Sequence, residues 1–308
     1  MISGEIRTSH AEIGGPLVEV LAKDFGDHLV HGELGEPGRL TPFRMNAPTL
    51  QVKRAIGAAA GQKQNQDRPG ILYCYALASS VREIGGVRIC EPTRTGMLYG
   101  PEGTSKVGEI ALQIARLTVG DVMRLVIAQH AANAKGGIIR HACAPCEHCG
   151  TPIGVIDVKI NEDAPLRVVR PQVSAEARPR AWVCLHNPIE MADGRLVRSV
   201  LVAPPTWHST IWHATQKQFA EPVSLVAILH AGAIVDTDLE GVRTVSVQDL
   251  EYSLTSEDAD LLDEAMELIA PAPVFRVGVT CPNPDCGEIN EAPINWLDLS
   301  FLRRASAG

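Results

Sequence analysis

The sequence predicts an α+β fold in which two helix–strand–cysteine-knuckle repeats share a zinc-ribbon-like site, preceded by a mixed, partly helical N-terminal region. Three observations support this prediction. A stretch that begins at Leu117 recurs 137 positions later at Leu254. Each stretch ends on a cysteine pair whose second member, Cys149 or Cys286, precedes a glycine. Runs with helical apolar spacing alternate with short β-rich runs, and the 27 Gly and 21 Pro residues indicate many turns between them.

These patterns divide the chain into four segments. We expect a mixed N-terminal region at residues 1–104, a first helix–knuckle module at 105–164, a β-hairpin and helical insert at 165–250, and a second helix–knuckle module at 251–308.

Three runs in the N-terminal region have the spacing of short helices, at residues 17–25, 50–61 and 71–84. The glycines at 85–86 end the last of them, because glycine adopts the left-handed conformation that commonly follows a helix. A short strand is expected at 87–90.

The first module opens with an amphipathic helix at 107–117. Thr118 and Asp121 then resemble a capping box, with Asp in place of the usual Glu or Gln, and predict a second helix. Strands at 138–142 and 154–160 would lead into and out of the first knuckle.

In the insert, strands at 181–186 and 196–203 flank a turn at 192–194, which is typical of a β-hairpin. Helices are expected at 210–219 and 223–230.

The second module follows the order of the first. Thr255 with Asp258 predicts the start of a helix that ends before Pro271. Strands are expected at 274–280 and 294–301, on either side of the second knuckle.

The cysteine pairs carry the chemistry. Cys146 and Cys149 form a tight Cys-x2-Cys turn, and Cys281 and Cys286 form a wider one. The second pair has no third cysteine and no nearby histidine, so it cannot complete the four-ligand tetrahedron that zinc prefers. The economical arrangement is one structural Zn2+ site held by Cys146, Cys149, Cys281 and Cys286.

Cys143 leaves an alternative open. With Cys146 and Cys149 it makes a Cys-x2-Cys-x2-Cys run, which begins like a bacterial ferredoxin motif but lacks the following Cys-Pro. Cys143 is therefore an alternative ligand, and an iron–sulfur cluster that also uses a distant cysteine is the alternative to zinc.

Composition excludes several functions. The net charge of -8 argues against nucleic-acid binding. There is no phosphate-binding loop, nucleophile elbow or His-Glu-x-x-His motif, so we expect neither an enzyme nor a small-molecule substrate. No membrane span or secretory signal is visible, and the clustered cysteines indicate a reducing cytoplasm. The single cysteines Cys74, Cys90 and Cys184 are expected to be buried hydrophobic residues.

The second half of the chain resembles the T4-type phage baseplate proteins of contractile tails and related injection machines. The resemblance rests on the Leu-Val-x-Pro-Pro-Thr stretch at 201–206, the helical stretch after it, the Leu-Thr-Ser-Glu-Asp segment at 254–262, and the second knuckle with its apolar ending at 294–302. The first helix and knuckle, from Leu117, have the same order. Ala259 stands where the family usually has Arg, and the second knuckle is enlarged.

This resemblance implies a non-enzymatic component or assembly factor of a baseplate. Its partners would be other baseplate and tail proteins, in the cytoplasm of the producing cell and in the finished particle. Two other functions remain as alternatives. One is a zinc-ribbon adaptor of transcription or translation machinery, which the acidic charge disfavours. The other is a His-Asn-His-type metal-dependent nuclease using His186, Asn187 and Pro188, which the long separation of the knuckles disfavours.

Overall fold

The computed structural model describes residues 5–8, 18–21, 28–29, 41–61, 69–133, 138–159, 167–170, 180–212, 224–269, 273–274 and 276–293. The helices are α2 (Leu50–Ala60), α4 (Pro69–Ser80), α5 (Val107–Ala115), α6 (Val119–Asn133), α7 (Leu225–Ala233), α8 (Val247–Ser253), α9 (Ser256–Ile269) and a π-helical turn η1 (His208–Trp212).

The strands are β1 (Glu5–Thr8), β2 (Val18–Leu21), β3 (His28–Leu29), β4 (Thr41–Met45), β5 (Val81–Ile84), β6 (Val87–Arg88), β7 (Cys90–Thr93), β8 (Gly96–Tyr99), β9 (Ile138–Cys143), β10 (Gly154–Lys159), β11 (Arg167–Arg170), β12 (Ala181–Glu190), β13 (Leu196–Val202), β14 (Ile234–Thr237), β15 (Pro273–Val274), β16 (Arg276–Thr280) and β17 (Ile289–Pro293).

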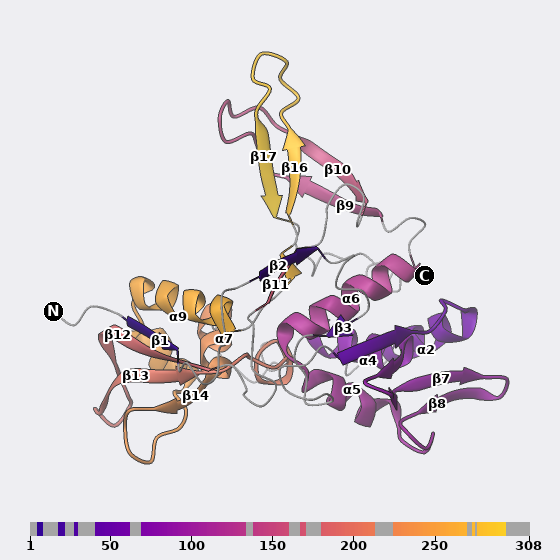
Figure 1. The fold of residues 1–308 in the computed structure, drawn as a ribbon, viewed down its shortest axis with the longest axis horizontal. Helices are drawn as coiled ribbons and strands as arrows, with labels where there is room; N and C mark the ends of the chain where they lie inside the picture. The colour runs from indigo at the N-terminus through magenta and orange to yellow at the C-terminus, as the bar shows by residue number, and fades with distance from the viewer. Residues whose placement is uncertain are drawn as a thin grey trace.

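Helices and several small sheets are mixed along the chain, which agrees with the predicted α+β class (Figure 1). Two sheets have four strands, in the orders β3-β4-β5-β6 and β1-β12-β13-β14. The strands β2, β11 and β15 form a third sheet, and β7–β8, β9–β10 and β16–β17 are two-stranded. Each paired strand whose register is known runs antiparallel to its neighbour.

Two hydrophobic cores lie at separate places. The first is built from α4, α5, α6, β4 and β5, and it also receives Ile211 of η1 and Trp207, the residue before η1. The second is built from β12, β13, α7, α8 and α9. Both cores run across segment boundaries drawn from the sequence, the first across residues 104 and 105 and the second across 250 and 251.

Several predicted elements are confirmed. The structure has a helix at α2, a helix at α5, and a helix after each capping pattern. Thr118 and Thr255 accept hydrogen bonds from the backbone N–H of Asp121 and Asp258, both at 3.2 Å. The hairpin of β12 and β13 also forms where the turn at 192–194 predicted it.

The helix predicted at residues 17–25 is wrong over its described part. Residues 18–21 form strand β2, which pairs with β11 through contacts such as Val20 with Val168. A helix of nine residues is marginal by itself, so cross-strand hydrogen bonds and the β-branched Val18 and Val20 decide the conformation.

The helix predicted at 71–84 ends early. Helix α4 stops at Ser80, and the next residue already belongs to β5. Val81 and Ile84 are fully buried and pair with β4, so the last four residues gain more from the sheet than from another helical turn.

Three further predictions are adjusted. The described part of the helix expected at 210–219 is the π-helical turn η1, and the rest lies outside the described residues. Helix α7 occupies Leu225–Ala233, two residues later than expected. The strand after the second knuckle is Ile289–Pro293, because pairing with β16 starts at once, whereas 294–301 lies outside the described residues.

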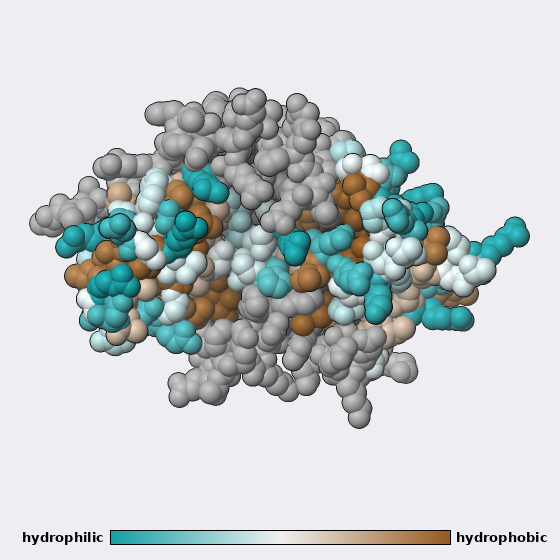
Figure 2. All heavy atoms as spheres, turned by 90° about the horizontal axis from the view of Figure 1, so that it is seen from below, coloured by the Kyte–Doolittle hydropathy of each residue, from teal (hydrophilic) through white to brown (hydrophobic). Residues whose placement is uncertain are grey.

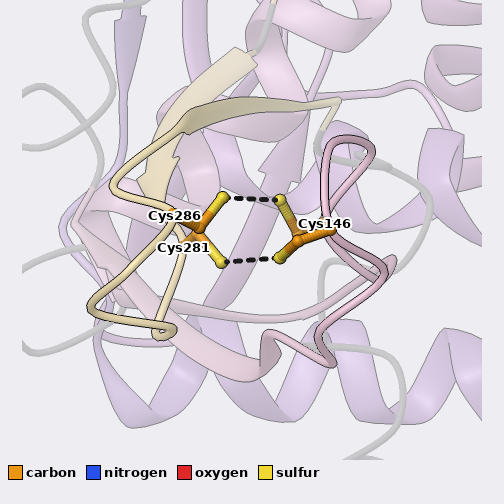
Figure 3. A group of neighbouring side chains, drawn as sticks. Cys146, Cys281 and Cys286 are labelled. Carbon is orange, nitrogen blue, oxygen red and sulfur yellow. Dashed lines mark hydrogen bonds between the residues drawn. The ribbon is translucent and has the colours of Figure 1, made fainter.

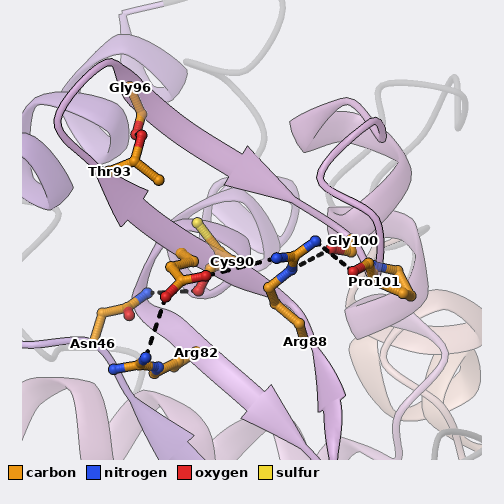
Figure 4. Close-up of polar contacts among 9 residues, drawn as sticks. Asn46, Arg82, Arg88, Cys90, Thr93, Gly96, Gly100 and Pro101 are labelled. Carbon is orange, nitrogen blue, oxygen red and sulfur yellow. Dashed lines mark hydrogen bonds and ion pairs between the residues drawn. The ribbon is translucent and has the colours of Figure 1, made fainter.

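A short hairpin, β7–β8, extends from the first core (Figure 1). Its base is held by polar contacts that Figure 4 shows. The Arg88 guanidinium donates from Nε to the carbonyl of Gly100 at 2.9 Å and also contacts the carbonyl of Pro101. Glu91 forms ion pairs with Arg82 at 3.2 Å and with Arg88 at 3.6 Å. These contacts satisfy the carbonyls of Gly100 and Pro101 at the base of the hairpin and orient it.

Candidate metal centre

Each cysteine pair lies in the turn of a two-stranded hairpin. The pairing of β9 with β10 ends at Cys143 and Gly154, and the pairing of β16 with β17 ends at Thr280 and Ile289. The chain between the paired ends therefore has to reverse direction, and both cysteine pairs lie in these reversals. The two hairpins stand side by side and project away from the two cores (Figure 1).

Backbone hydrogen bonds shape both turns. In the first, the N–H of Cys146 donates to the carbonyl of Thr151 at 2.9 Å. In the second, the N–H of Cys281 donates to the carbonyl of Glu288 at 2.8 Å. Gly150 has a φ of 70° and its counterpart after Cys286 has a φ of 61°, so each turn uses a left-handed conformation that favours glycine.

The four sulfurs predicted as ligands come together. The Sγ atoms of Cys146, Cys149, Cys281 and Cys286 all lie within 4.8 Å of one another (Figure 3). Sγ of Cys146 is 3.9 Å from that of Cys286, and Sγ of Cys149 is 3.6 Å from that of Cys281. All four are free thiols, and a disulfide would require about 2.0 Å.

These distances suit a tetrahedral ion. Two sulfurs of a regular tetrahedral site with zinc–sulfur bonds of about 2.3 Å lie about 3.8 Å apart. Both of these contacts join one hairpin to the other, because each one pairs a sulfur of the first knuckle with a sulfur of the second. The donor set therefore fits a single ion placed between the hairpins, and four sulfurs leave no open position on it.

Side chains around the sulfurs polarise them. The Thr151 hydroxyl lies 3.1 Å from Sγ of Cys149 and lowers the pKa of this thiol to about 6. Backbone N–H groups of the same knuckle, with Asn290, lower the pKa of Cys146. Burial, together with the nearby sulfurs, raises the pKa of Cys281 to about 12. Four crowded sulfurs resist joint ionisation, and a divalent cation among them would remove that conflict.

Two asparagines of the second hairpin reach the first knuckle, and the sequence alone had not indicated them. Asn290 accepts a hydrogen bond from the N–H of Glu147 at 3.0 Å and places its Nδ2 3.4 Å from Sγ of Cys146. Nδ2 of Asn283 lies 3.9 Å from Sγ of Cys149. Amide donors at thiolates are common around sulfur sites, and their position a few residues from a cysteine was the one available signal.

Cys143 is not part of the four-sulfur group. It is the last residue of β9, is half-buried and packs against the first core. Burial raises its pKa. The sulfur cluster takes two cysteines from each hairpin instead of three from the first.

The remaining candidates have structural surroundings. Cys74 and Cys90 are fully buried, as expected, and burial raises the pKa of Cys90 to about 12. Cys184 is half-buried and lies 3.5 Å from the hydroxyl of Ser199.

The residues of the nuclease alternative lie in strand β12, far from either knuckle in sequence. The backbone N–H groups of His186 and Asn187 donate to the carboxylate of Asp258 at 2.6 and 3.1 Å. This arrangement fixes a strand; the His186 ring lies 3.7 Å from the carboxylate of Glu257, and no third potential ligand joins them among the described residues. Over the described residues, the sulfur cluster is the one grouping of three or more His, Cys, Asp or Glu side chains placed to hold an ion.

Comparison with known proteins adds no relative. No protein-family model, curated protein or solved structure matches this chain. None of the helices in the described parts of the chain combines the length and the apolar character needed to cross a bilayer.

Proposed function

We propose that this protein is a non-enzymatic structural protein in which a Zn2+ ion, held by Cys146, Cys149, Cys281 and Cys286, joins two helix–knuckle modules in a zinc-ribbon-like site. One observation carries this proposal: Sγ of each proposed ligand in the first hairpin lies close to Sγ of one in the second, at 3.6 Å in one pair and 3.9 Å in the other. The four cysteines would supply four thiolate ligands and leave the ion no open coordination position, which is typical of structural zinc.

Zinc at this place would act on the fold as a whole. The two knuckles are more than a hundred residues apart in the chain, so the ion would close a long loop. Both hairpins expose apolar side chains: Val155 and Ile289 are 63% and 65% exposed, and Cys143, Ile156 and Val279, which pack against the first core, are only partly buried. Because structural zinc contributes about 10 kcal/mol or more of binding free energy in small peptides, the metal would be the main term that holds the hairpins together.

We further propose that this zinc-joined framework serves in the baseplate of a contractile tail or injection machine. Support comes from the resemblance described for residues 201–206, 254–262 and the second knuckle. A protein of this kind would act by contacts with other baseplate and tail proteins, and it would be made in the cytoplasm of the producing cell. Genes for sheath, tube or spike proteins are expected beside its gene, and a neighbourhood without any of them would contradict this assignment.

Metal analysis tests the zinc. Purified wild-type protein should contain about one zinc per chain by plasma mass spectrometry. Cys281→Ser should lose it and unfold at a temperature about 10 °C lower, as expected for the loss of about 4 kcal/mol. Cys143→Ser is the matched control and should retain both metal and stability. Two zinc ions per chain, iron in place of zinc, or loss of metal in the control would refute the four-cysteine zinc site.

A further inference from the structure

The same strand pairing occurs twice in the chain. In the first instance β4 pairs with β5, and in the second β13 pairs with β14. Each pair has a shift of register at the last residue before it separates, where Met45 faces Val81 and Val202 faces Ile234. In both, the second strand follows a helix without any intervening residue.

The hydrogen bonds next to these strands repeat as well. Asn46, the residue after β4, donates its N–H to the carbonyl of Ser80, the last residue of α4, at 2.7 Å. In the same way Ala203, the residue after β13, donates to the carbonyl of Ala233, the last residue of α7, at 2.9 Å. Three residues further on, Thr49 and Thr206 each accept a hydrogen bond from the N–H three positions later, at 3.4 and 3.1 Å. Both threonines follow a proline.

The agreement continues to the knuckles. Gly-Val-Arg follows at residues 86–88 and again at 241–243, and each glycine has a positive φ, 81° and 78°. Two helices, a capping threonine and a cysteine hairpin then complete each set. We call residues 41–159 the first unit and 196–293 the second unit; β7–β8 is a hairpin that the first unit has in addition.

The units are packed head to tail. Trp207, the residue after the capping threonine of the second unit, is fully buried in the core of the first. Its Nε1 donates to the carbonyl of Gly70 at 2.8 Å, and its ring meets that of Tyr73 edge-on at 6.0 Å. Its N–H donates to the carbonyl of Leu117 at 2.9 Å. The second unit thus inserts one end into a receiving surface of the first.

Among the described residues, the corresponding end of the first unit inserts into no receiving surface. Leu50 follows the capping Thr49 as Trp207 follows Thr206, and it is 84% exposed. The three residues before it are exposed too. This donor segment, residues 47–50, opens helix α2, which lies at one end of the molecule, with α7 and α9 toward the other (Figure 1).

The corresponding receiving surface on the second unit is partly exposed, although Leu254 also packs against the second core and Asn187 and Glu190 of β12 contact Thr255 and Ser253 beside it. Counting back from the end of each helix, Val226 of α7 corresponds to Tyr73 of α4, and it is 46% exposed. Leu254 corresponds to Leu117 and is partly exposed. Tyr252 of α8 is 81% exposed, and its neighbour Glu251 accepts a hydrogen bond from the N–H of Ser224, which holds the end of α8 against the start of α7.

We propose that this protein associates head to tail with further copies of itself, residues 47–50 of one molecule docking on the Val226, Tyr252 and Leu254 surface of the next. Each contact would repeat the packing that Trp207 makes inside the chain. An interface of this heterologous type does not close on itself in a pair, so it extends into a ring or a filament. The inference depends on neither the metal nor the baseplate assignment.

Surface character supports the proposal. Leu50 and Tyr252 are the two most exposed large hydrophobic residues of the described chain, and one lies on each of the two faces. In the view from below, hydrophobic side chains reach the surface on both halves of the molecule (Figure 2). Apolar groups of this kind gain free energy when a neighbouring molecule covers them.

Sedimentation velocity between about 1 μM and about 1 mM tests the association, since this range covers weak protein contacts. Wild-type protein should form larger species as its concentration rises. Leu50→Asp and Val226→Asp should each weaken self-association by about 100-fold or more, because a buried unpaired charge is costly. Leu196→Asp, on an exposed leucine of β13 outside both faces, should assemble like the wild type.

The decisive experiment mixes the two defective variants. Leu50→Asp keeps an intact receiving surface and Val226→Asp keeps an intact donor segment, so the mixture should form a one-to-one dimer and nothing larger. Tyr252→Asp replaces Val226→Asp if circular dichroism shows that the latter is unfolded. A wild-type protein that stays monomeric throughout, variants that assemble normally, or a mixture that stays monomeric would each overturn the proposal.

Discussion

Asp258 provides a sharp test of how a local motif serves the tertiary structure. It is fully buried at the start of α9, where Thr255 donates to its carboxylate at 2.7 Å. The register of β12 against β13 shifts between Cys184 and Ile189, so the ladder does not pair the backbone there. The N–H groups of His186 and Asn187, in this bulge, donate to Asp258 instead, and the amide of Asn187 adds a contact at 3.2 Å.

Asp258→Ala removes all these bonds at once. Two part-buried backbone N–H groups of β12 would lose this acceptor, and the loss of an acceptor costs up to about 1–3 kcal/mol where the donor stays unsatisfied. We therefore expect a loss of about 4 kcal/mol in the free energy of unfolding, well above the typical loss of about 1 kcal/mol for a single substitution. Asp258→Asn keeps one acceptor oxygen and should lose about half as much.

Urea denaturation followed by circular dichroism measures the loss. Asp260→Ala, which removes an exposed carboxylate from the same helix, is the control and should change stability by less than about 0.5 kcal/mol. Equal losses in the two alanine variants would refute the idea that Asp258 satisfies the bulge of β12.

The pH dependence adds an independent check. Burial raises the pKa of Asp258, but the hydrogen bonds from Thr255, His186 and Asn187 outweigh it and hold the pKa below the ordinary value. A depressed folded pKa stabilises the protein fully above the unfolded value of about 3.9, and this contribution is lost as the pH falls through the folded pKa. The difference in the free energy of unfolding between wild type and Asp258→Asn should therefore be constant between about pH 5 and about pH 8 and should narrow below about pH 4. A gap that widened in acid would contradict this sign.

Two glycines in helices should respond oppositely to alanine. Gly57→Ala should raise stability by about 0.5–1 kcal/mol, because nothing lies within 4 Å of the added Cβ. Gly232→Ala should lower stability by about 1–3 kcal/mol, because its Cβ would lie 2.7 Å from the carbonyl oxygen of Ser209. Chemical denaturation of both variants measures the two changes. A stabilising Gly232→Ala would show that α7 and η1 can move apart. His230→Leu should be neutral or stabilising by about 1 kcal/mol in thermal unfolding: the imidazole is fully buried, its Nδ1 has no hydrogen-bond partner in the described structure, and the corresponding position of α4 is the buried Leu77. A loss above about 2 kcal/mol would mean that the 2.8 Å contact between His230 and Asp263 outweighs the burial cost.

The candidate metal ligands could be predicted from sequence because two local facts were enough. A cysteine pair closed by glycine makes a turn, and a pair with no other ligand nearby must find two more elsewhere. This count selected four cysteines that the structure brings within 4.8 Å of one another. The asparagines that contact the sulfurs could not be selected in the same way, because Asn290 reaches Cys146 only once the two hairpins lie side by side.

The same distinction separates the helices and strands that could be predicted from those that could not. The helices after Thr118 and Thr255 were predictable, since a cap acts within three residues of its own position. Residues 18–21 were not, because their strand exists only through pairing with β11, about 150 positions away. The end of α4 was missed for a related reason: Val81 leaves the helix to meet β4, which a helical pattern does not register.

The sequence by itself therefore determined the caps, the knuckle turns, the α+β class and the two pairs of cysteines, all of which depend on interactions a few residues long. The tertiary structure alone decided which segments meet. Trp207 and Leu50 follow equivalent capping threonines, yet one is fully buried and the other 84% exposed. No local signal separates them, because burial depends on whether another part of the chain offers a matching surface, and within the described residues Trp207 meets one whereas Leu50 does not.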